Sequence, residues 1–234
     1  MAGDKILVFG ATGPAGIVLL RELLHRKLPV LAYCRTPSKI PEDLSSNPLL
    51  EVVKGDMSQQ DAISLAISRS RAVISLLGPS SGKLASNTEF ADYYRTIVPL
   101  MKEHNVSRIL AVGTVSIYQP NDHSSVTRLV MCNLIKFMAN SAYHNIIAIQ
   151  EYFETLNDTS IDWTVFRVGW LGGAADQAAW LADREKDKVF AGPVGAPGFT
   201  SGINRSALAY WLADEATANP AIWVRQMPAV SKAG

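Results

Sequence analysis

Short apolar runs alternate along this chain with longer segments in which apolar residues recur every three or four positions. The short runs predict strands at 5–9, 29–34, 50–54, 71–77, 107–112 and 162–167. The longer segments predict helices at 14–26, 59–69, 89–104, 126–157 and 204–216. Runs such as 72–77 and 108–112 are nearly continuous in apolar residues, which is typical of a parallel sheet with helices on both faces. We therefore predict an α/β fold, a doubly wound Rossmann sheet with strand order 3-2-1-4-5-6.

The first predicted strand runs straight into a glycine-rich turn that precedes an apolar helix pattern. Gly10 would permit the tight exit from the strand, and Gly13 would let backbone N–H groups come close to a diphosphate. Gly16 would let the helix pack on the sheet while the helix N-terminus faces the negative charge. Glycines at this spacing also occur in plain turns, but the strand before and the helix after them favour a dinucleotide site. The residues expected there are Gly10, Thr12, Gly13, Pro14, Ala15 and Gly16.

The segment after the second predicted strand bears on the choice between NAD and NADP. A fold that prefers NAD usually carries an acidic residue about 20 residues past the glycines, where it binds the ribose diol. No Asp or Glu stands from residue 23 to residue 41, and Arg35 and Lys39 follow the strand instead. Their cationic groups suit a 2′-phosphate, whereas a merely solvated basic loop would leave the missing carboxylate unexplained. We therefore expect NADP(H) as the cofactor.

Three further segments follow predicted strands at the same sheet edge. Asp56 and Met57 come after the third strand, where they would meet the adenine, although Asp56 could equally cap the helix that begins near Ser58 or Gln59. Residues 78–87 and 118–125 are rich in turn formers and can line a pocket. We predict one domain, 1–234, in which 168–203 forms a small segment that covers the substrate, although its glycine clusters could be ordinary connections.

Together these motifs resemble the atypical short-chain dehydrogenase/reductase superfamily, specifically its small NmrA-like and biliverdin-reductase-B-like NAD(P)H-binding proteins. The matching stretches are GATGPAG at 10–16, CRTPSK at 34–39, KGDM at 54–57, SLLG at 75–78 and IDWTVFRVG at 161–169. The resemblance implies that Leu76, Leu77 and Gly78 pass beside the adenine ribose and the nicotinamide. It also identifies 112–118 as the strand-five stretch, which places Val112 beside the cofactor and gives Thr114 the role of polarising a substrate carbonyl.

The same resemblance implies a catalytic Tyr, a Lys four residues later and commonly a Glu four beyond that. Counting back from Glu151 gives Tyr143 at the first position and Ile147 where the lysine would stand. Without that positive charge the phenol keeps a pKa near 10 and stays protonated. A protonated phenol can donate a proton but is a poor base for alcohol oxidation at neutral pH, so reduction is favoured. Tyr143 could equally be a helix residue packed in the core.

Other side chains near that edge are candidates for donating a proton or stacking on substrate. His123 could donate a proton with its ring oriented by Asp122, or it could be a solvated loop residue. Tyr118 and Trp170 begin the loops after strands five and six, where their rings could stack on a flat substrate or fill the core. The predicted helix 126–157 has an apolar stripe that we expect in the core, with a dimer seam as the alternative. The stripe consists of Val126, Leu129, Val130, Leu134, Phe137 and Met138.

The amino-acid composition limits which binding partners and which cellular location we expect. With 234 residues, 48% of them hydrophobic, the chain can bury a full core. Its 22 basic and 21 acidic residues nearly balance, so we expect neither nucleic acid nor a membrane as partner. Cys34 and Cys132 fit no metal-binding spacing, and no metal is expected. A strand at residue 5 leaves no room for a signal peptide, and we expect a cytoplasmic monomer or homodimer.

The leading functional hypothesis is an NADPH-dependent oxidoreductase. It would transfer hydride to a small apolar, planar substrate of the carbonyl, enone or quinone type. An NADP(H)-binding redox sensor or regulatory protein without turnover is the first alternative, which the missing lysine fits directly. A non-redox isomerase or cyclase on the same fold is the second.

Overall fold

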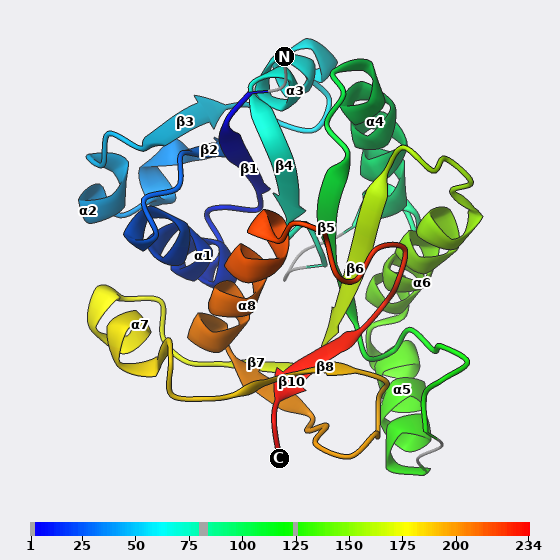
Figure 1. Cartoon of the computed structure of the whole chain (residues 1–234). Coiled ribbons are helices and arrows are strands. Elements are labelled where there is room, and N and C mark those ends of the chain that lie inside the picture. The colour runs from blue at the N-terminus through cyan, green and yellow to red at the C-terminus, as the bar shows by residue number, and fades with distance from the viewer. Residues whose placement is uncertain (1–2, 80–83, 124–125) are drawn as a thin grey trace.

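The computed structural model describes residues 3–79, 84–123 and 126–234 (Figure 1). In this part of the chain the main sheet has the order β3-β2-β1-β4-β5-β6-β10-β8. Its first six strands are parallel and confirm the predicted 3-2-1-4-5-6 arrangement. They are β1 (Lys5–Phe9), β2 (Val30–Cys34), β3 (Leu50–Lys54), β4 (Ser70–Ser75), β5 (Arg108–Thr114) and β6 (Asp162–Val168).

The C-terminal part of the chain adds strands that the sequence pattern did not predict. β10 (Ala229–Lys232) pairs parallel to β6, and β8 (Val189–Gly192) pairs antiparallel to β10. A separate two-stranded sheet joins β7 (Trp170–Gly172) to β9 (Gly202–Asn204). These strands are three or four residues long, too short for apolar periodicity to distinguish them from loops. The predicted substrate-covering segment 168–203 therefore contains β7, α7 (Gln177–Asp183), β8 and part of β9.

Helices cover both faces of the sheet, as predicted (Figure 1). On one face, α1 (Pro14–His25) packs against α8 (Arg205–Thr217). On the other face lie α3 (Gln60–Ser68), α4 (Glu89–Glu103) and α6 (Asn140–Thr155). Short helical turns, 3-10 turn η1 (Pro37–Lys39) and α2 (Glu42–Ser45), connect β2 to β3. The parallel strands thus end together at one edge, which is where ligands bind in folds of this kind.

The prediction of one long helix at 126–157 is wrong. The backbone leaves helical geometry at Ala139, with φ −133° and ψ 51°, so α5 (Val126–Met138) and α6 are separate helices. The expected burial of the apolar stripe is also wrong, because Phe137 is 88% exposed and Leu129, Val130, Leu134 and Met138 are exposed as well. The side chain of Val126 lies outside the described set. The stripe is exposed because α5 packs on α6 at the rim of the molecule, beyond the sheet (Figure 1).

Two predicted pocket loops are described only in part. Of 78–87, residues 80–83 lie outside the described residues, as do 124–125 of 118–125. No helix in the described ranges is both long and apolar enough to cross a membrane.

Candidate functional site

Two of the three glycines after β1 are required by the packing of the protein itself. Gly10 has φ +76°, which L side chains rarely adopt, and a Cβ there would lie 2.9 Å from the backbone of Leu76. A Cβ on Gly16 would overlap the Gly10 carbonyl oxygen and the backbone of Ala11. Gly16 therefore lets the first turn of α1 pack on the preceding turn of the chain, rather than on the sheet as expected.

Gly13 differs because no residue that the structure describes crowds the space beside it. A Cβ there would have the Gly10 carbonyl oxygen as its nearest contact, at an ordinary 3.7 Å. Gly13 is also the N-cap of α1, and no side chain caps the free N–H groups of that helix. Pro14 at the first helical position has no N–H to satisfy. The open space and the uncapped helix N-terminus fit a diphosphate group.

The ends of β2 and β3 meet at the position expected for the adenine. The Tyr33 hydroxyl donates a hydrogen bond to the carbonyl oxygen of Asp56 at 2.8 Å, and a Cβ on Gly55 would overlap that hydroxyl. The Asp56 carboxylate accepts bonds from the hydroxyl and the backbone N–H of Ser58, at 2.5 and 2.8 Å. These bonds, with the nearby charge of Arg35, lower the pKa of Asp56. Asp56 thus holds the turn before α3, which begins at Gln60.

Arg35 and Lys39 are both exposed at the end of β2, as the 2′-phosphate assignment requires. Neither forms an ion pair with any residue that the structure describes. Arg35 lies close enough to Asp56 and Tyr93 for its charge to lower the pKa of each. It therefore remains available to a phosphate.

Sequence reasoning missed the contribution of α4 to this corner. Burial and a 2.5 Å hydrogen bond to Glu89 raise the pKa of Tyr93 to about 12, despite the opposing charge of Arg35. Glu89 also accepts a bond from the backbone N–H of Ala85, at 2.8 Å, and so ties the loop after β4 to α4. No motif marks Tyr93 or Glu89, and only the packing of α4 brings them beside Arg35.

The residues expected near the nicotinamide line the ends of β4 and β5. Leu76, Leu77 and Gly78 are half-buried directly after β4. A Cβ on Gly78 would meet the Val112 side chain at 3.6 Å, so these two residues lie side by side. Thr114 ends β5, half-buried, and its hydroxyl accepts a hydrogen bond from the Ser116 N–H at 3.3 Å.

Two tyrosines lie near each other beyond β5. Tyr143 is half-buried in the first turn of α6, with the Lys136 ammonium 5.6 Å from the centre of its ring. Burial and the neighbouring Cys132 raise the pKa of Tyr118, and the proximity of Tyr143 adds to the rise. The Tyr118 ring stacks on the Arg128 guanidinium at 4.0 Å. The Tyr118 phenol is therefore neutral at pH 7, and both hydroxyl groups can donate hydrogen bonds.

Of the two alternatives for His123, the structure favours a solvated loop residue over a ring oriented by Asp122. Arg167 binds the Asp122 carboxylate at 2.6 and 2.8 Å, and Arg128 binds it at 2.9 Å. Backbone N–H groups of Val194 and Gln119 complete the set at 2.8 and 3.0 Å. His123 is exposed, and its backbone N–H donates to the Val194 carbonyl. A carboxylate buried against two guanidinium groups has no free lone pair directed at a neighbouring loop side chain.

The side chain of Trp170 lines a surface pocket. Its side chain is 83% exposed in β7, so it does not fill the core. The pocket has a volume of about 410 Å³ between β7, β9 and the end of β10. Its lining residues are Trp170, Gly172, Thr200, Ser201, Gly202, Ile203, Asn204 and Lys232.

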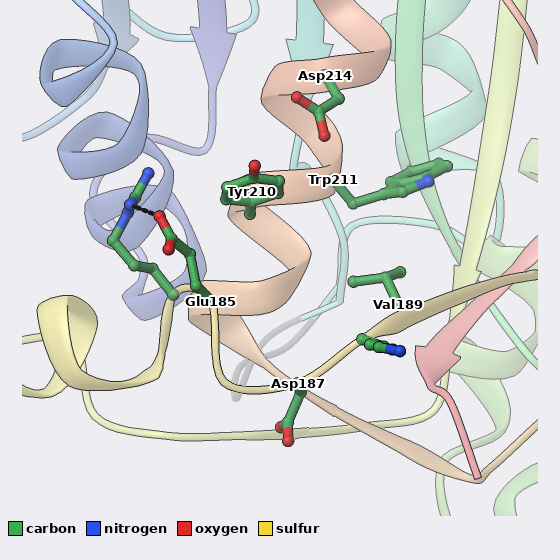
Figure 2. A pocket seen from close by; sticks show the side chains of 8 residues that line it. Glu185, Asp187, Val189, Tyr210, Trp211 and Asp214 are labelled. Atoms are coloured by element: carbon green, nitrogen blue, oxygen red, sulfur yellow. Dashed lines mark hydrogen bonds and ion pairs between the residues drawn. The ribbon is translucent and has the colours of Figure 1, made fainter.

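A larger pocket, of about 540 Å³, lies between α8 and the segment before β8 (Figure 2). Tyr210, Trp211 and Asp214 of α8 face Glu185, Asp187 and Val189. The lining residues between 184 and 189 belong to the predicted covering segment, but the described lining includes none of the residues predicted individually for cofactor or substrate. Its charged groups are largely paired with one another or with neighbours. We therefore place the functional site at the glycine turn. The described residues contain no cluster of three or more His, Cys, Asp or Glu side chains that could bind a metal.

Comparison with known proteins identifies the family of this chain. A family model described as NAD(P)H-binding matches residues 10–219. A short-chain dehydrogenase/reductase from Veillonella parvula, solved in complex with NADP, is 18% identical, with a TM-score of 0.73 over 99% of this chain and 95% of that one. An anaerobilin reductase from Escherichia coli O157:H7 is 18% identical, with a TM-score of 0.70 over 97% of each chain. A putative epimerase from Bacteroides thetaiotaomicron is 22% identical, with a TM-score of 0.69 over 99% and 98%. The family model confirms the predicted NAD(P)H-binding family, and the solved structures share the fold of this chain.

Proposed function

This chain belongs to the NAD(P)H-binding family, and we propose that it is an NADPH-dependent reductase of a small apolar, planar substrate with a carbonyl, enone or quinone group. One observation carries the choice of NADPH over NADH. Arg35 and Lys39 stand exposed after β2, where a fold that prefers NADH usually carries a carboxylate, and neither forms an ion pair with a described residue.

Different residues at the carboxyl edge of the sheet would bind different parts of NADPH. The open space at Gly13 and the N-terminus of α1 would take the diphosphate, and Arg35 with Lys39 would take the 2′-phosphate. Asp56 and Met57 would border the adenine, and the stretch from Leu76 to Gly78 with Val112 would border the ribose and nicotinamide. When bound, the cofactor supplies the hydride.

The side chains beyond β5 supply hydrogen bonds and a proton to the substrate. Thr114 offers a hydroxyl at the end of β5, and Tyr143 offers a phenol hydroxyl. A protonated donor suits reduction, because the substrate oxygen gains negative charge as it accepts hydride. Ile147 leaves this phenol without the lysine that would make it a base for the reverse reaction. The exposed rings of Tyr118 and Trp170 offer flat apolar surfaces to a planar substrate.

NADPH consumption tests this proposal directly. The full-length protein is mixed with NADPH and a panel of quinones, flavins and enones, and the absorbance of NADPH is followed. We expect loss of NADPH that depends on the acceptor, is slower with NADH, and is absent in Gly13→Val. Tight NADPH binding without turnover of any acceptor would contradict a reductase.

A second candidate, an NADP(H)-binding sensor, is favoured by one observation. The position of the catalytic lysine is occupied by Ile147, whose half-buried aliphatic side chain cannot bind the ribose through a charge. A sensor would bind NADPH and NADP⁺ with different affinities and would not consume either. Parallel titrations with both forms therefore separate it from the reductase.

A further inference from the structure

Among the described side chains of helix α5, the arginine is buried and five large apolar residues are exposed. The side chains of Arg128 and Cys132 are buried against the rest of the protein. On the outer side, Leu129, Val130, Leu134, Phe137 and Met138 are 55%, 60%, 48%, 88% and 75% exposed. We call these five residues the α5 patch. A helix at the surface of a monomer normally turns its apolar side inward, so this arrangement indicates a face that is covered by something else.

Buried contacts hold the helix in this orientation. The Arg128 guanidinium donates to the carbonyl oxygens of Val115 and Ile117, at 2.9 and 2.6 Å, and to the Asp122 carboxylate at 2.9 Å. Its face also stacks on the Tyr118 ring. Rotating α5 to bury the patch would pull this guanidinium out of its site and leave Asp122 with one cation fewer. The patch is therefore a stable feature of the folded chain.

We infer that the α5 patch is the contact surface of a homodimer, in which α5 of one copy packs on α5 of a second copy. A fully exposed Phe side chain presents roughly 150 to 250 Å² and Val, Leu and Met present less, so the five exposed fractions together leave about 500 Å². A two-fold contact buries the same patch on both copies, about 1,000 Å² in total, which is the lower limit for a specific interface. The inference is independent of the proposed function.

Two other occupants fit the patch less well. A substrate at the carboxyl edge would contact the side of α5 that carries Arg128, whereas Val130 lies about 200° further round the helix. A helix that lies on a membrane usually carries several lysines or arginines on its polar side. In the described part of α5 the exposed cation is Lys136, since Arg128 is buried in its ion pair. A second copy needs no such charge.

Molar mass in solution tests the inference. Light scattering coupled to size-exclusion chromatography should give the wild type twice the chain mass of 25.4 kDa at micromolar concentration. The double substitution Val130→Asp with Phe137→Asp should halve that mass, because both side chains are exposed in the monomer and buried in the dimer. The matched control is Leu65→Asp on α3, which is 61% exposed, and it should remain a dimer. Circular dichroism confirms that each variant is folded.

A cross-link locates the contact. Leu134→Cys, near the middle of the patch, should form an intermolecular disulfide on mild oxidation, and Leu65→Cys should not. A wild type that stays monomeric, or a dimer that survives the double substitution, would overturn the inference. The inference would also be overturned if the protein were a monomer that floats with phosphatidylcholine–phosphatidylserine vesicles and the Phe137→Asp variant did not. The patch would then be a membrane-binding surface.

Discussion

Asp122 and Arg167 are 45 residues apart in the chain, yet they form a two-point ion pair in the protein interior. The Asp122 side chain is 3% exposed and that of Arg167 is 1% exposed. The pair joins the loop after β5 to β6, and Arg128 adds α5 to the same carboxylate. The position of Tyr118, which begins this loop, and the orientation of the α5 patch therefore depend on one buried charge.

We predict that Asp122→Asn lowers the free energy of unfolding by about 3 to 5 kcal/mol, because it leaves two buried guanidinium groups without a counter-charge. Urea unfolding measures the loss, and Asp61→Asn, an exposed change on α3, should stay within about 0.5 kcal/mol of the wild type. An equally small effect of Asp122→Asn would show that the ion pair contributes little.

The same carboxylate predicts a pH dependence. Burial by itself would raise the pKa of Asp122, but the bonds from Arg167 and the Val194 N–H outweigh it and hold the pKa well below its usual range. A lowered pKa contributes stability that is complete above about pH 4 and is lost as the pH falls further. The gap in stability between wild type and Asp122→Asn should therefore narrow in acid and stay constant from pH 5 to 7.

The two glycines of the turn should respond differently to substitution. Gly13→Val should leave the protein folded and abolish NADPH binding, because the side chain enters the space that the diphosphate would occupy. Gly16→Ala should instead destabilise the fold, because its Cβ overlaps the backbone of the turn. Thermal unfolding and NADPH titration of both variants separate these effects. If the folded Gly13→Val variant kept its affinity for NADPH, the glycine motif after β1 would be a structural turn and not a nucleotide site.

We expect Arg35→Ala to weaken NADPH binding by roughly 2 kcal/mol and to leave NADH nearly unchanged, because only NADPH carries the 2′-phosphate. Calorimetric titration with both cofactors measures this difference. Arg71→Ala is the matched control, since this exposed arginine lies at the start of β4, at the opposite edge of the sheet. Equal loss for the two cofactors would remove Arg35 from the 2′-phosphate site.

If the protein is a reductase, Tyr143→Phe should lower the rate of reduction about 10²- to 10⁴-fold without changing NADPH affinity, because the phenol supplies the proton. Single-turnover kinetics measure the step. A loss of only a fewfold would assign the proton to another donor, and His123→Ala is then the next variant to measure.

Ile147→Lys should restore the missing positive charge. Residue 147 stands one helical turn after Tyr143 on the same side of α6, so an ammonium there would lower the pKa of the phenol. The rate of the oxidative direction should then rise at neutral pH, and its pH profile should shift toward acid. Should the variant fail to fold, residue 147 is a packing position and the assignment of Tyr143 is wrong.

The sequence alone determined the features that depend on residues close together in the chain. Apolar runs and their spacing predicted the six parallel strands and their order, and the glycines after the first strand predicted the nucleotide turn. The lack of Asp and Glu from residue 23 to residue 41 is also a local feature, because this segment surrounds β2 and includes Arg35 directly after it.

The tertiary structure decided the features that depend on partners far away in the chain. Which side of α5 faces outward was decided by the fit of Arg128 onto Asp122, and the environment of Asp122 was decided by Arg167 on another strand. Tyr93 of α4 comes close to Arg35 and Asp56 only in the folded chain, because it lies far from both in the sequence. The spacing of apolar residues predicts that a helix has an apolar side. Which side is buried depends on the surface that the helix packs against. On α5 it is Arg128 that finds polar partners in the protein, and Leu129 and Leu134 face solvent.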